Sequence, residues 1–215
     1  MDKQNGGARD FCYKAFKRLI DILGGIVGCI ILIPVLIAVK IAFCVTGDWD
    51  KLIFTQERIG QNGKKIKIHK FRSMVKNADD ALENLLKEDD AAREEYEQYK
   101  KLKNDPRITR VGKFIRTYSI DEMPQFFDVL LGKMSLVGPR PYLWREREAM
   151  GDGYELIITC KPGISGYWQV NGRSNTDFSE RLVMEKYYCT HKSTLMDLKI
   201  LFQTFYKVIK KDGAE

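Results

Sequence analysis

The chain has 215 residues, enough for one domain with an appendage. Lys and Arg number 36 against 29 Asp and Glu, so the net charge of +7 suits an anionic partner such as a lipid head group or a nucleotide phosphate. The five cysteines form no C-x-x-C pair, which argues against a disulfide framework or a zinc site and fits a reducing compartment. Nucleic-acid binding is disfavoured, because basic and acidic residues are interleaved and no recognition motif is present.

The N-terminal part predicts a membrane anchor. Residues 1–10 are polar and are expected to be disordered. The run Ile22–Val39 has no charge and reaches the length of a membrane helix, and it is too long for a signal-peptide core. Basic residues flank both ends, which favours the cytoplasmic side for both. Since Pro34 removes a backbone donor, we expect residues 11–48 to form a re-entrant helix broken at Pro34; a single kinked crossing is the alternative.

Residues 49–215 predict a cytosolic domain of α/β class that is mostly helical and irregular, with several amphipathic interfacial helices. A β-hairpin is expected over Ile53–Lys70, where Gln61-Asn62-Gly63 supply a turn and alternating residues follow. A long, charged amphipathic helix is expected to run as far as Lys103. A last amphipathic helix near residues 198–209 suits either the core or a membrane interface, as interfacial helices do.

Two adjacent carboxylates, Asp121 and Glu122, are the best candidate for chemistry. Ser119 and Glu122 match the S-x-x-E capping box of a helix start, and capping alone would explain acidic residues there. However, cations on both sides could hold a polyphosphate next to an acidic nucleophile or metal ligand: Arg107, Arg110, Lys113, Arg116, Lys133 and Arg140. No P-loop, dinucleotide-binding, zinc-protease or nucleophile-elbow motif competes with this pair.

Two loop-rich segments follow the acidic pair. In Met134–Pro141, prolines on either side of Arg140 fix the backbone and would aim its guanidinium at a phosphate; a solvated arginine in a rigid turn is the alternative. The segment Lys161–Arg173 combines glycines, aromatic rings, amides and cations. It suits a nucleotide or sugar pocket as well as a surface turn.

Taken in order, these segments resemble the bacterial sugar transferases, the monotopic polyprenyl-phosphate phosphoglycosyl transferases of glycan assembly. The resemblance covers about Phe16–Gly213 and is carried by Lys70–Met74, Asp105–Thr109, Arg116–Gln125, Met134–Pro141 and Lys161–Arg173. It departs from the family at the membrane break, where Ile33-Pro34 stands in place of the Ser-Pro of many members.

The resemblance implies an enzyme that moves a sugar 1-phosphate from a UDP-sugar to undecaprenyl phosphate and releases UMP. It implies a place in the bacterial inner membrane, with the active site on the cytoplasmic face, at the first membrane step of exopolysaccharide, capsule or O-antigen assembly. Asp121 would be the nucleophile that forms a phosphosugar-aspartate, and Glu122 would join it in holding Mg²⁺.

Further roles follow from the same resemblance. The substrate phosphates would bind Arg116, Arg140, Lys70 and Arg72. The nucleotide and sugar would lie near Gln125, Arg107, Gln169, Asn171 and Arg173.

Residues Trp168–Arg173 and the ending Lys211–Ala214 are similar to members that transfer galactose or glucose 1-phosphate. A non-catalytic membrane adaptor of a glycan assembly complex is the alternative function. The sequence leaves the oligomeric state open, and a homodimer is compatible with it.

Overall fold

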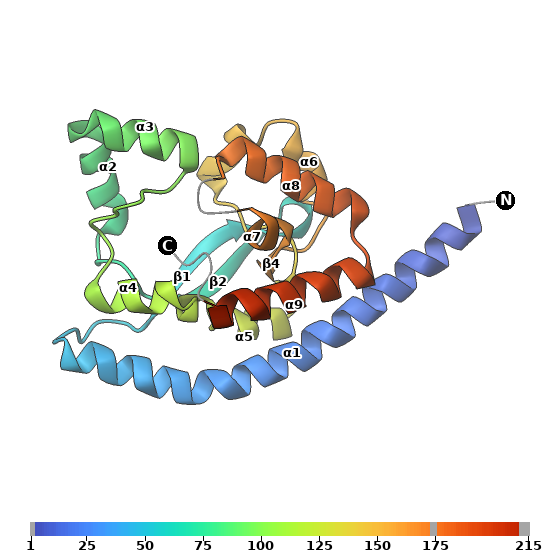
Figure 1. The fold of residues 1–215 in the computed structure, drawn as a ribbon, viewed down its shortest axis with the longest axis horizontal. Coiled ribbons are helices and arrows are strands. Elements are labelled where there is room, and N and C mark those ends of the chain that lie inside the picture. Colours follow the sequence, from blue (N-terminus) through green and yellow to red (C-terminus); the bar gives the residue numbers. More distant parts are fainter. Residues whose placement is uncertain (1–2, 173–175, 211–215) are drawn as a thin grey trace.

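The computed structural model describes residues 3–172 and 176–210. Helix α1 (Lys3–Val45) is a single bowed helix that runs along one edge of the domain (Figure 1). It includes residues 3–10, which the sequence predicts as disordered, and it continues through Pro34. The predicted break is therefore absent from this structure. A proline inside a helix removes only one backbone hydrogen bond, and the bonds on either side of it can maintain the helix.

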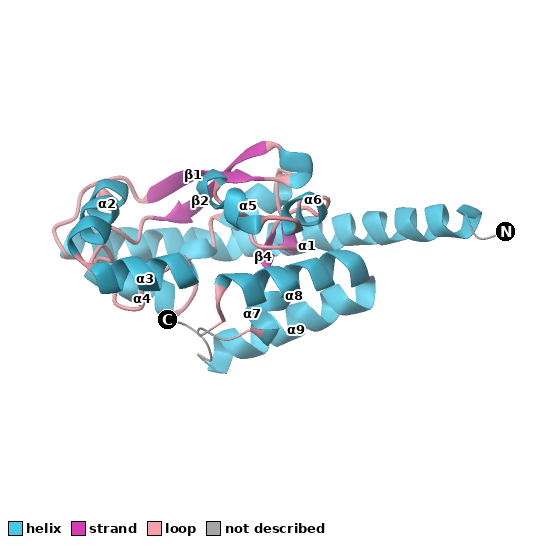
Figure 2. Ribbon diagram, turned by 90° about the horizontal axis from the view of Figure 1, so that it is seen from above, coloured by secondary structure: helices cyan, strands magenta, loops and turns pink. Residues whose placement is uncertain are grey.

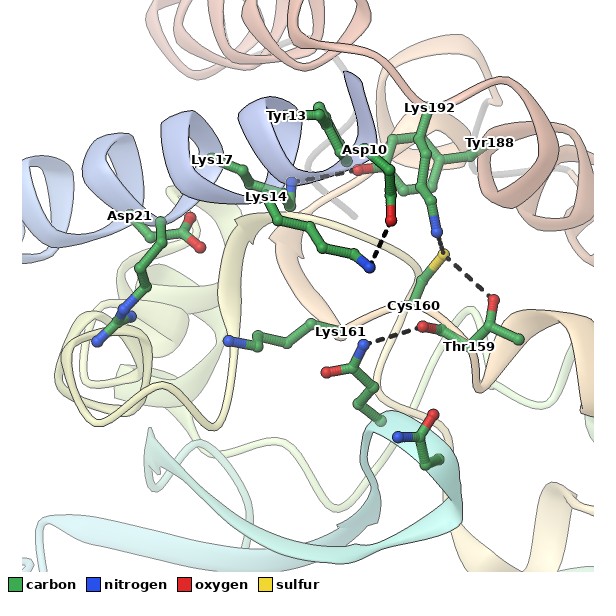
Figure 3. A pocket seen from close by; sticks show the side chains of 13 residues that line it. Asp10, Tyr13, Lys14, Lys17, Asp21, Thr159, Cys160, Lys161, Tyr188 and Lys192 are labelled. Carbon is green, nitrogen blue, oxygen red and sulfur yellow. Dashed lines mark hydrogen bonds and ion pairs between the residues drawn. The ribbon is translucent and has the colours of Figure 1, made fainter. Parts of the chain in front are cut away.

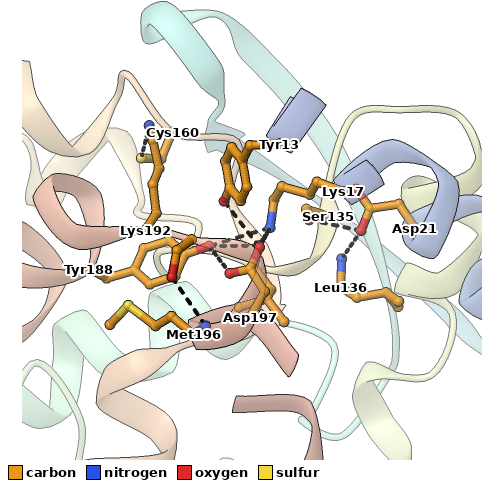
Figure 4. Close-up of polar contacts among 12 residues, drawn as sticks. Tyr13, Lys17, Asp21, Ser135, Leu136, Cys160, Tyr188, Lys192, Met196 and Asp197 are labelled. Atoms are coloured by element: carbon orange, nitrogen blue, oxygen red, sulfur yellow. Dashed lines mark hydrogen bonds and ion pairs between the residues drawn. The ribbon is translucent and has the colours of Figure 1, made fainter. Parts of the chain in front are cut away.

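The first part of α1 is fastened to the domain by polar side chains. The Lys17 ammonium lies 2.7 Å from Asp197, and the hydroxyls of Tyr13 and Tyr188 donate hydrogen bonds to the same carboxylate (Figure 4). Asp21 accepts hydrogen bonds from the Ser135 hydroxyl and the Leu136 amide. The first part of α1 is therefore attached to the domain through this face.

The opposite face of α1 is apolar and open. Exposed side chains recur every three or four residues along it, including Leu23, Ile30, Ile33, Ile37 and Ile41. The segment Asp10–Val45 is long and apolar enough to cross a membrane, although length and composition alone are weak evidence for a crossing. The bulky apolar surface nevertheless needs a partner, since soluble monomers rarely expose so large a patch.

The hairpin prediction is confirmed. Strands β1 (Ile53–Ile59) and β2 (Lys65–Phe71) pair antiparallel, with Ile53 opposite Phe71 and the turn η1 (Gln61–Gly63) between them. The single long charged helix is wrong, because α2 (Ala78–Glu88) and α3 (Asp90–Tyr99) are separate helices. Asp89 is extended and its side chain accepts a hydrogen bond from the Ala92 amide, so it begins a new helix.

Short helices and a second pair of strands build the rest of the domain. Helix α4 (Arg110–Thr117), the turn η2 (Ile120–Glu122) and helix α5 (Gln125–Leu130) follow the charged helices. Strands β3 (Ser135–Val137) and β4 (Gly163–Ser165) pair parallel, which the sequence did not indicate. Between them lie η3 (Trp144–Glu146), η4 (Glu148–Met150) and α6 (Gly153–Ile157). The chain then forms α7 (Tyr167–Asn171), α8 (Phe178–His191) and α9 (Thr194–Lys210).

Two apolar clusters hold these elements together. The larger joins the hairpin to β3, α8 and α9 through side chains such as Ile68, Val137, Tyr188 and Ile200, and Figure 2 shows the hairpin and α8–α9 on opposite sides of the domain. The smaller joins the second half of α1 to β2 and α4 through buried residues: Leu32, Val39, Phe43, Phe71 and Ile115. Ile120 packs on this smaller cluster, which therefore supports the turn that carries the acidic pair.

Helix α9 divides its side chains between the core and the outside. Asp197 and Ile200 are buried, whereas Phe202 is 75% exposed and Phe205 is 68% exposed. One face of α9 therefore packs on the core, as one of the two predicted settings requires, and the other face is exposed; the membrane interface stays a prediction.

Candidate active site

Asp121 and Glu122 lie on the three-residue turn η2 rather than at the start of a regular helix. The predicted capping box is absent: Ser119 has a left-handed backbone, with φ 53°, and its side chain caps nothing. The Glu122 carboxylate instead forms an ion pair with Lys70, whose Nζ lies 2.6 Å from Oε1. The tight turn places the two adjacent carboxylates in different surroundings, because Asp121 is 8% exposed and the Glu122 side chain is 33% exposed.

These surroundings separate the two carboxyl groups chemically. Burial, reinforced by the charge of Glu122, raises the pKa of Asp121 to about 6, against the opposing effects of Lys70 and Arg116. Burial would also raise the pKa of Glu122, but Lys70, Arg140 and Arg58 outweigh it and hold that pKa below its usual range. Glu122 is therefore a stable anion, and Asp121 is a desolvated carboxyl without an ion pair to any described residue.

Arg116 is held beside Asp121 by a close approach of two backbones. Its Nε donates a 3.0 Å hydrogen bond to the Ser73 hydroxyl from the last turn of α4. Gly112, one turn earlier, lies so near the Ser73 carbonyl that a Cβ would overlap with it. Arg116 lies near enough to act on Asp121 electrostatically, and its contact with the substrate phosphates stays a prediction.

A second group of cations acts on Glu122. Arg140 and Arg58 both act on the Glu122 carboxyl, and Arg140 also acts on Arg181 in α8. Burial, followed by the like charge of Arg140, lowers the pKa of Arg58 and of Arg181 to about 10 each. The structure therefore brings Arg58 and Arg140, from distant parts of the sequence, near Glu122, and Arg181 lies within electrostatic range of Arg140.

Glu185 lies within this arginine group and is fully buried. Its Oε1 accepts a hydrogen bond from the Arg140 amide at 2.7 Å, which fixes the backbone between the two prolines. Burial raises the pKa of Glu185 to about 8 despite the nearby Arg140 and Arg181. With Glu185 neutral, the guanidinium groups keep their positive charge available for a ligand.

Several buried polar atoms in this region have no hydrogen-bond partner among the described residues. They include Nε of Arg58, Arg140 and Arg181, the hydroxyl of Tyr142, and Oε2 of Glu185. Unsatisfied buried groups are rare in native proteins and call for a missing partner. A bound anion that accepts hydrogen bonds would satisfy the arginines.

Sequence reasoning missed Arg58, Arg181 and Glu185. The sequence indicates Arg58 only as a flanking positive charge, whereas in the structure it lies opposite Ile66 in the hairpin and is buried. Arg181 and Glu185 have helical i, i+4 spacing in α8. That spacing is equally typical of a surface ion pair, and only the fold shows that the pair is buried.

Two arginines predicted to contact the substrate, Arg72 at the phosphates and Arg107 at the nucleotide or sugar, are engaged elsewhere. Arg72 bonds to the Asp48 carboxylate at 2.7 Å and stacks over Phe43, at the end of α1. Arg107 is buried against the Asp105 carboxylate, with Nη2 2.6 Å from Oδ2, and secures the turn before α4. The structure brings neither of them into contact with the acidic pair.

The amide side chains predicted to line the nucleotide and sugar pocket have different surroundings in the structure. Gln125 is almost fully buried directly after the acidic pair, and its Nε2 lacks a partner. Gln169 Nε2 bonds to the Ile164 carbonyl, while its Oε1 is unpaired. Asn171 is exposed and bonds only to its own helix. Arg173 lies outside the described residues.

The acidic pair is also the natural place to test for a divalent cation. No cluster of three or more His, Cys, Asp or Glu side chains is present among the described residues. Mg²⁺ is commonly held by one or two carboxylates together with water and substrate phosphates, so the donor set of Asp121 and Glu122 fits this mode of binding.

Comparison with known proteins places the chain in a family. The model of the bacterial sugar transferase family matches residues 12–211. This protein belongs to the bacterial sugar transferases. An uncharacterized sugar transferase of Haemophilus influenzae is 42% identical over 99% of this chain and 45% of its own length. The undecaprenyl-phosphate galactose phosphotransferase of Salmonella typhimurium is 44% identical over 92% of this chain and 41% of its own.

The extent of the match differs among relatives. The chain spans less than half the length of the Haemophilus and Salmonella proteins. It spans 87% of the exopolysaccharide production protein ExoY of Sinorhizobium fredii, to which it is 36% identical. Relatives of this bacterial sugar transferase are thus named for sugar phosphate transfer to undecaprenyl phosphate and for exopolysaccharide production.

Proposed function

We propose that this bacterial sugar transferase moves a hexose 1-phosphate from a UDP-hexose to undecaprenyl phosphate and releases UMP. The observation that carries the proposal is the contrast within the acidic pair: Asp121 is buried and forms no ion pair with any described residue, while Lys70 Nζ lies 2.6 Å from the Glu122 carboxylate. The guanidinium groups of Arg58 and Arg140, which act on Glu122, supply counter-charge for a diphosphate.

The reaction proceeds in two displacements. An oxygen of the Asp121 carboxylate forms a bond to the sugar-proximal phosphorus, and the bond from that phosphorus to the bridging oxygen breaks, so UMP departs with the electron pair. An oxygen of the lipid phosphate then attacks the same phosphorus and displaces Asp121, which regenerates the free carboxylate. Burial of Asp121 favours this role, because a desolvated carboxylate is a stronger nucleophile than a solvated one.

The chain's own charges have distinct tasks in this scheme. Arg116 binds the phosphoryl group on one side of Asp121, and Arg140 with Arg58 binds on the side of Glu122. Mg²⁺, held by Glu122 and Asp121, would neutralise charge that builds on the diphosphate. Galactose or glucose is the favoured sugar, since relatives are named for each of them.

We further propose that the protein lies on the cytoplasmic face of the inner membrane. The outward face of α1 would contact lipid, together with exposed aromatic side chains such as Phe202 and Phe205 of α9. The re-entrant form broken at Pro34 is a hypothesis for the lipid-bound protein.

The decisive experiment is UMP release from UDP-galactose, UDP-glucose and UDP-N-acetylglucosamine, with undecaprenyl phosphate and Mg²⁺. Wild type is compared with Asp121→Asn and with Asp80→Asn, which removes the same charge from an exposed position on α2. We expect release from one UDP-hexose that is lost in Asp121→Asn and retained in Asp80→Asn. A folded, membrane-bound wild type that releases no UMP from any donor would favour the non-catalytic adaptor.

A further inference from the structure

A cavity of about 590 Å³ lies beside the first part of α1, away from the acidic pair. Its walls come from α1, the hairpin turn η1, the segment 159–161 and the end of α8 (Figure 3). The smaller apolar cluster, on which Ile120 packs, contains α1 residues from Leu32 onward. The cavity is lined by α1 residues only as far as Asp21. With a helical rise of about 1.5 Å per residue, Lys17 in the cavity wall and Leu36 in that cluster are roughly 28 Å apart along α1.

The charged groups in the wall of this cavity are mostly cations. Five basic residues line it against two carboxylates, Asp10 and Asp21: the cations are Lys14, Lys17, Arg18, Lys161 and Lys192. Enclosing like charges in this way is costly unless an anion accompanies them. The cavity therefore has the electrostatic character of an anion site.

Four of the five cations already have partners. Lys17 is paired with Asp197, and Arg18 donates to the carbonyls of Val129 and Leu130. Lys14 pairs with Asp10 on the same helix, and Lys192 donates to the Cys160 sulfur at 3.2 Å. These contacts fix the wall in place.

Lys161 is the exception among the described residues that line the cavity. Its ammonium makes no hydrogen bond or ion pair with any described residue, and it extends into the cavity (Figure 3). Burial and, to a lesser extent, the like charges of Arg18 and Lys17 lower the pKa of Lys161, against the opposing effect of the Asp21 carboxylate. A bound anion would reverse both effects.

The cavity opens next to apolar surface. Its α1 residues, from Asp10 to Asp21, are spaced three or four apart and share one helix face. Phe11 and Ile22 lie at the edge of that face and are exposed, and the uncharged run begins at Ile22. A ligand with a phosphate in the cavity could therefore lay an acyl chain along α1.

We propose that this cavity binds the phosphate head group of an anionic membrane phospholipid, with Lys161 as its main unpartnered donor. Basic pockets beside membrane helices commonly recognise such head groups. The apolar border at Phe11 and Ile22 favours a lipid over a soluble phosphate. The site is independent of the transfer reaction, because none of its lining residues belongs to the acidic pair or the arginine group.

The test is the binding of short-chain phosphatidylglycerol to the purified full chain in zwitterionic detergent, measured by calorimetry. Short-chain phosphatidylcholine is the neutral comparison, and glycerol 1-phosphate is the head group without tails. We expect Lys161→Ala to weaken phosphatidylglycerol binding roughly tenfold, since one charge-assisted hydrogen bond is lost. Lys161→Arg keeps the charge and should stay within about threefold of wild type.

Lys87→Ala is the matched control, because Lys87 is exposed at the far end of α2 and carries the same charge. It should bind as wild type does. Equal weakening by Lys87→Ala and Lys161→Ala would show general surface charge and overturn the proposal. Equal affinity for phosphatidylcholine, or glycerol 1-phosphate binding as tight as the lipid, would overturn the assignment to an anionic lipid. Melting temperatures of all variants show whether a loss of binding reflects unfolding.

Discussion

Nζ of Lys70 lies 2.6 Å from Oε1 of Glu122, and this one contact makes two adjacent carboxylates unequal. Lys70 comes from the second hairpin strand and Glu122 from the turn after α4, so the pair also joins two elements of the domain. Without the ammonium, Glu122 would be an unpaired anion beside Asp121, and both carboxyl groups would ionise less readily.

We therefore expect Lys70→Met to lower kcat/KM for UMP release by about 100-fold, the typical effect of removing one preorganised charged donor. Lys67→Met is the control, because Lys67 lies three residues earlier on the same strand and is exposed. Steady-state kinetics with the preferred UDP-sugar measures both. A loss of similar size in Lys67→Met would show that general charge, rather than the Glu122 contact, is responsible.

The second prediction concerns Glu185 and pH. Its pKa is about 8 in the folded protein and about 4.5 when exposed, so the folded state binds a proton more tightly than the unfolded state does. The contribution of this group to stability is full below pH 4.5 and is lost as the pH rises to about 8.

Glu185→Gln keeps the acceptor for the Arg140 amide and removes the titration. We expect the free energy of unfolding of wild type to fall between pH 5 and pH 8, relative to this variant, by about 2 kcal/mol or more. Chemical denaturation at several pH values in that window measures the difference. Parallel pH dependences in the two proteins would mean that Glu185 ionises normally.

The sequence predicted several secondary-structure elements but not the buried charged residues around the candidate site. The hairpin and α9 carry local signals, namely a Gln-Asn-Gly turn and apolar residues at helical spacing, and both elements are confirmed. The capping box at Ser119 failed because a three-residue turn and a helix start share the same pattern of residues. Arg58, Arg181 and Glu185 were missed because their meeting depends on packing between the hairpin, the Gly-Pro-Arg-Pro segment and α8, which no local pattern encodes.

A further prediction tests how Arg116 is positioned. Gly112→Ala places a methyl group against the Ser73 carbonyl. Helix α4 must therefore move away from Ser73, whose hydroxyl accepts the hydrogen bond from Arg116. We expect a loss of about 2 kcal/mol of stability, and a fall in UMP release at temperatures where the variant is still folded. Gly153→Ala is the control, because its added methyl would meet only side chains at 3.5 Å or more. Full activity of folded Gly112→Ala would show that this backbone contact is not needed to position Arg116.

The last prediction concerns the path of α1 through the membrane. Cys12 and Cys44 lie near its two ends and serve as natural labels. If the helix enters and returns, or lies in the interface, both residues face the cytoplasm, whereas a single crossing places them on opposite sides. We expect a membrane-impermeant maleimide to label single-cysteine variants of both positions only from the cytoplasmic side. Ser179→Cys, exposed on α8, reports that side.

Pro34→Ala then distinguishes the two same-side arrangements. An interfacial helix already continues through this position, as in the structure, so the substitution should leave both labels on the cytoplasmic side. A re-entrant helix needs the break, and restoring the hydrogen bond at position 34 should straighten it and move one end across the membrane. Labelling of Cys12 from the outside in Pro34→Ala alone would thus establish the re-entrant form. Opposite labelling already in the parent protein would exclude both same-side arrangements and establish a crossing.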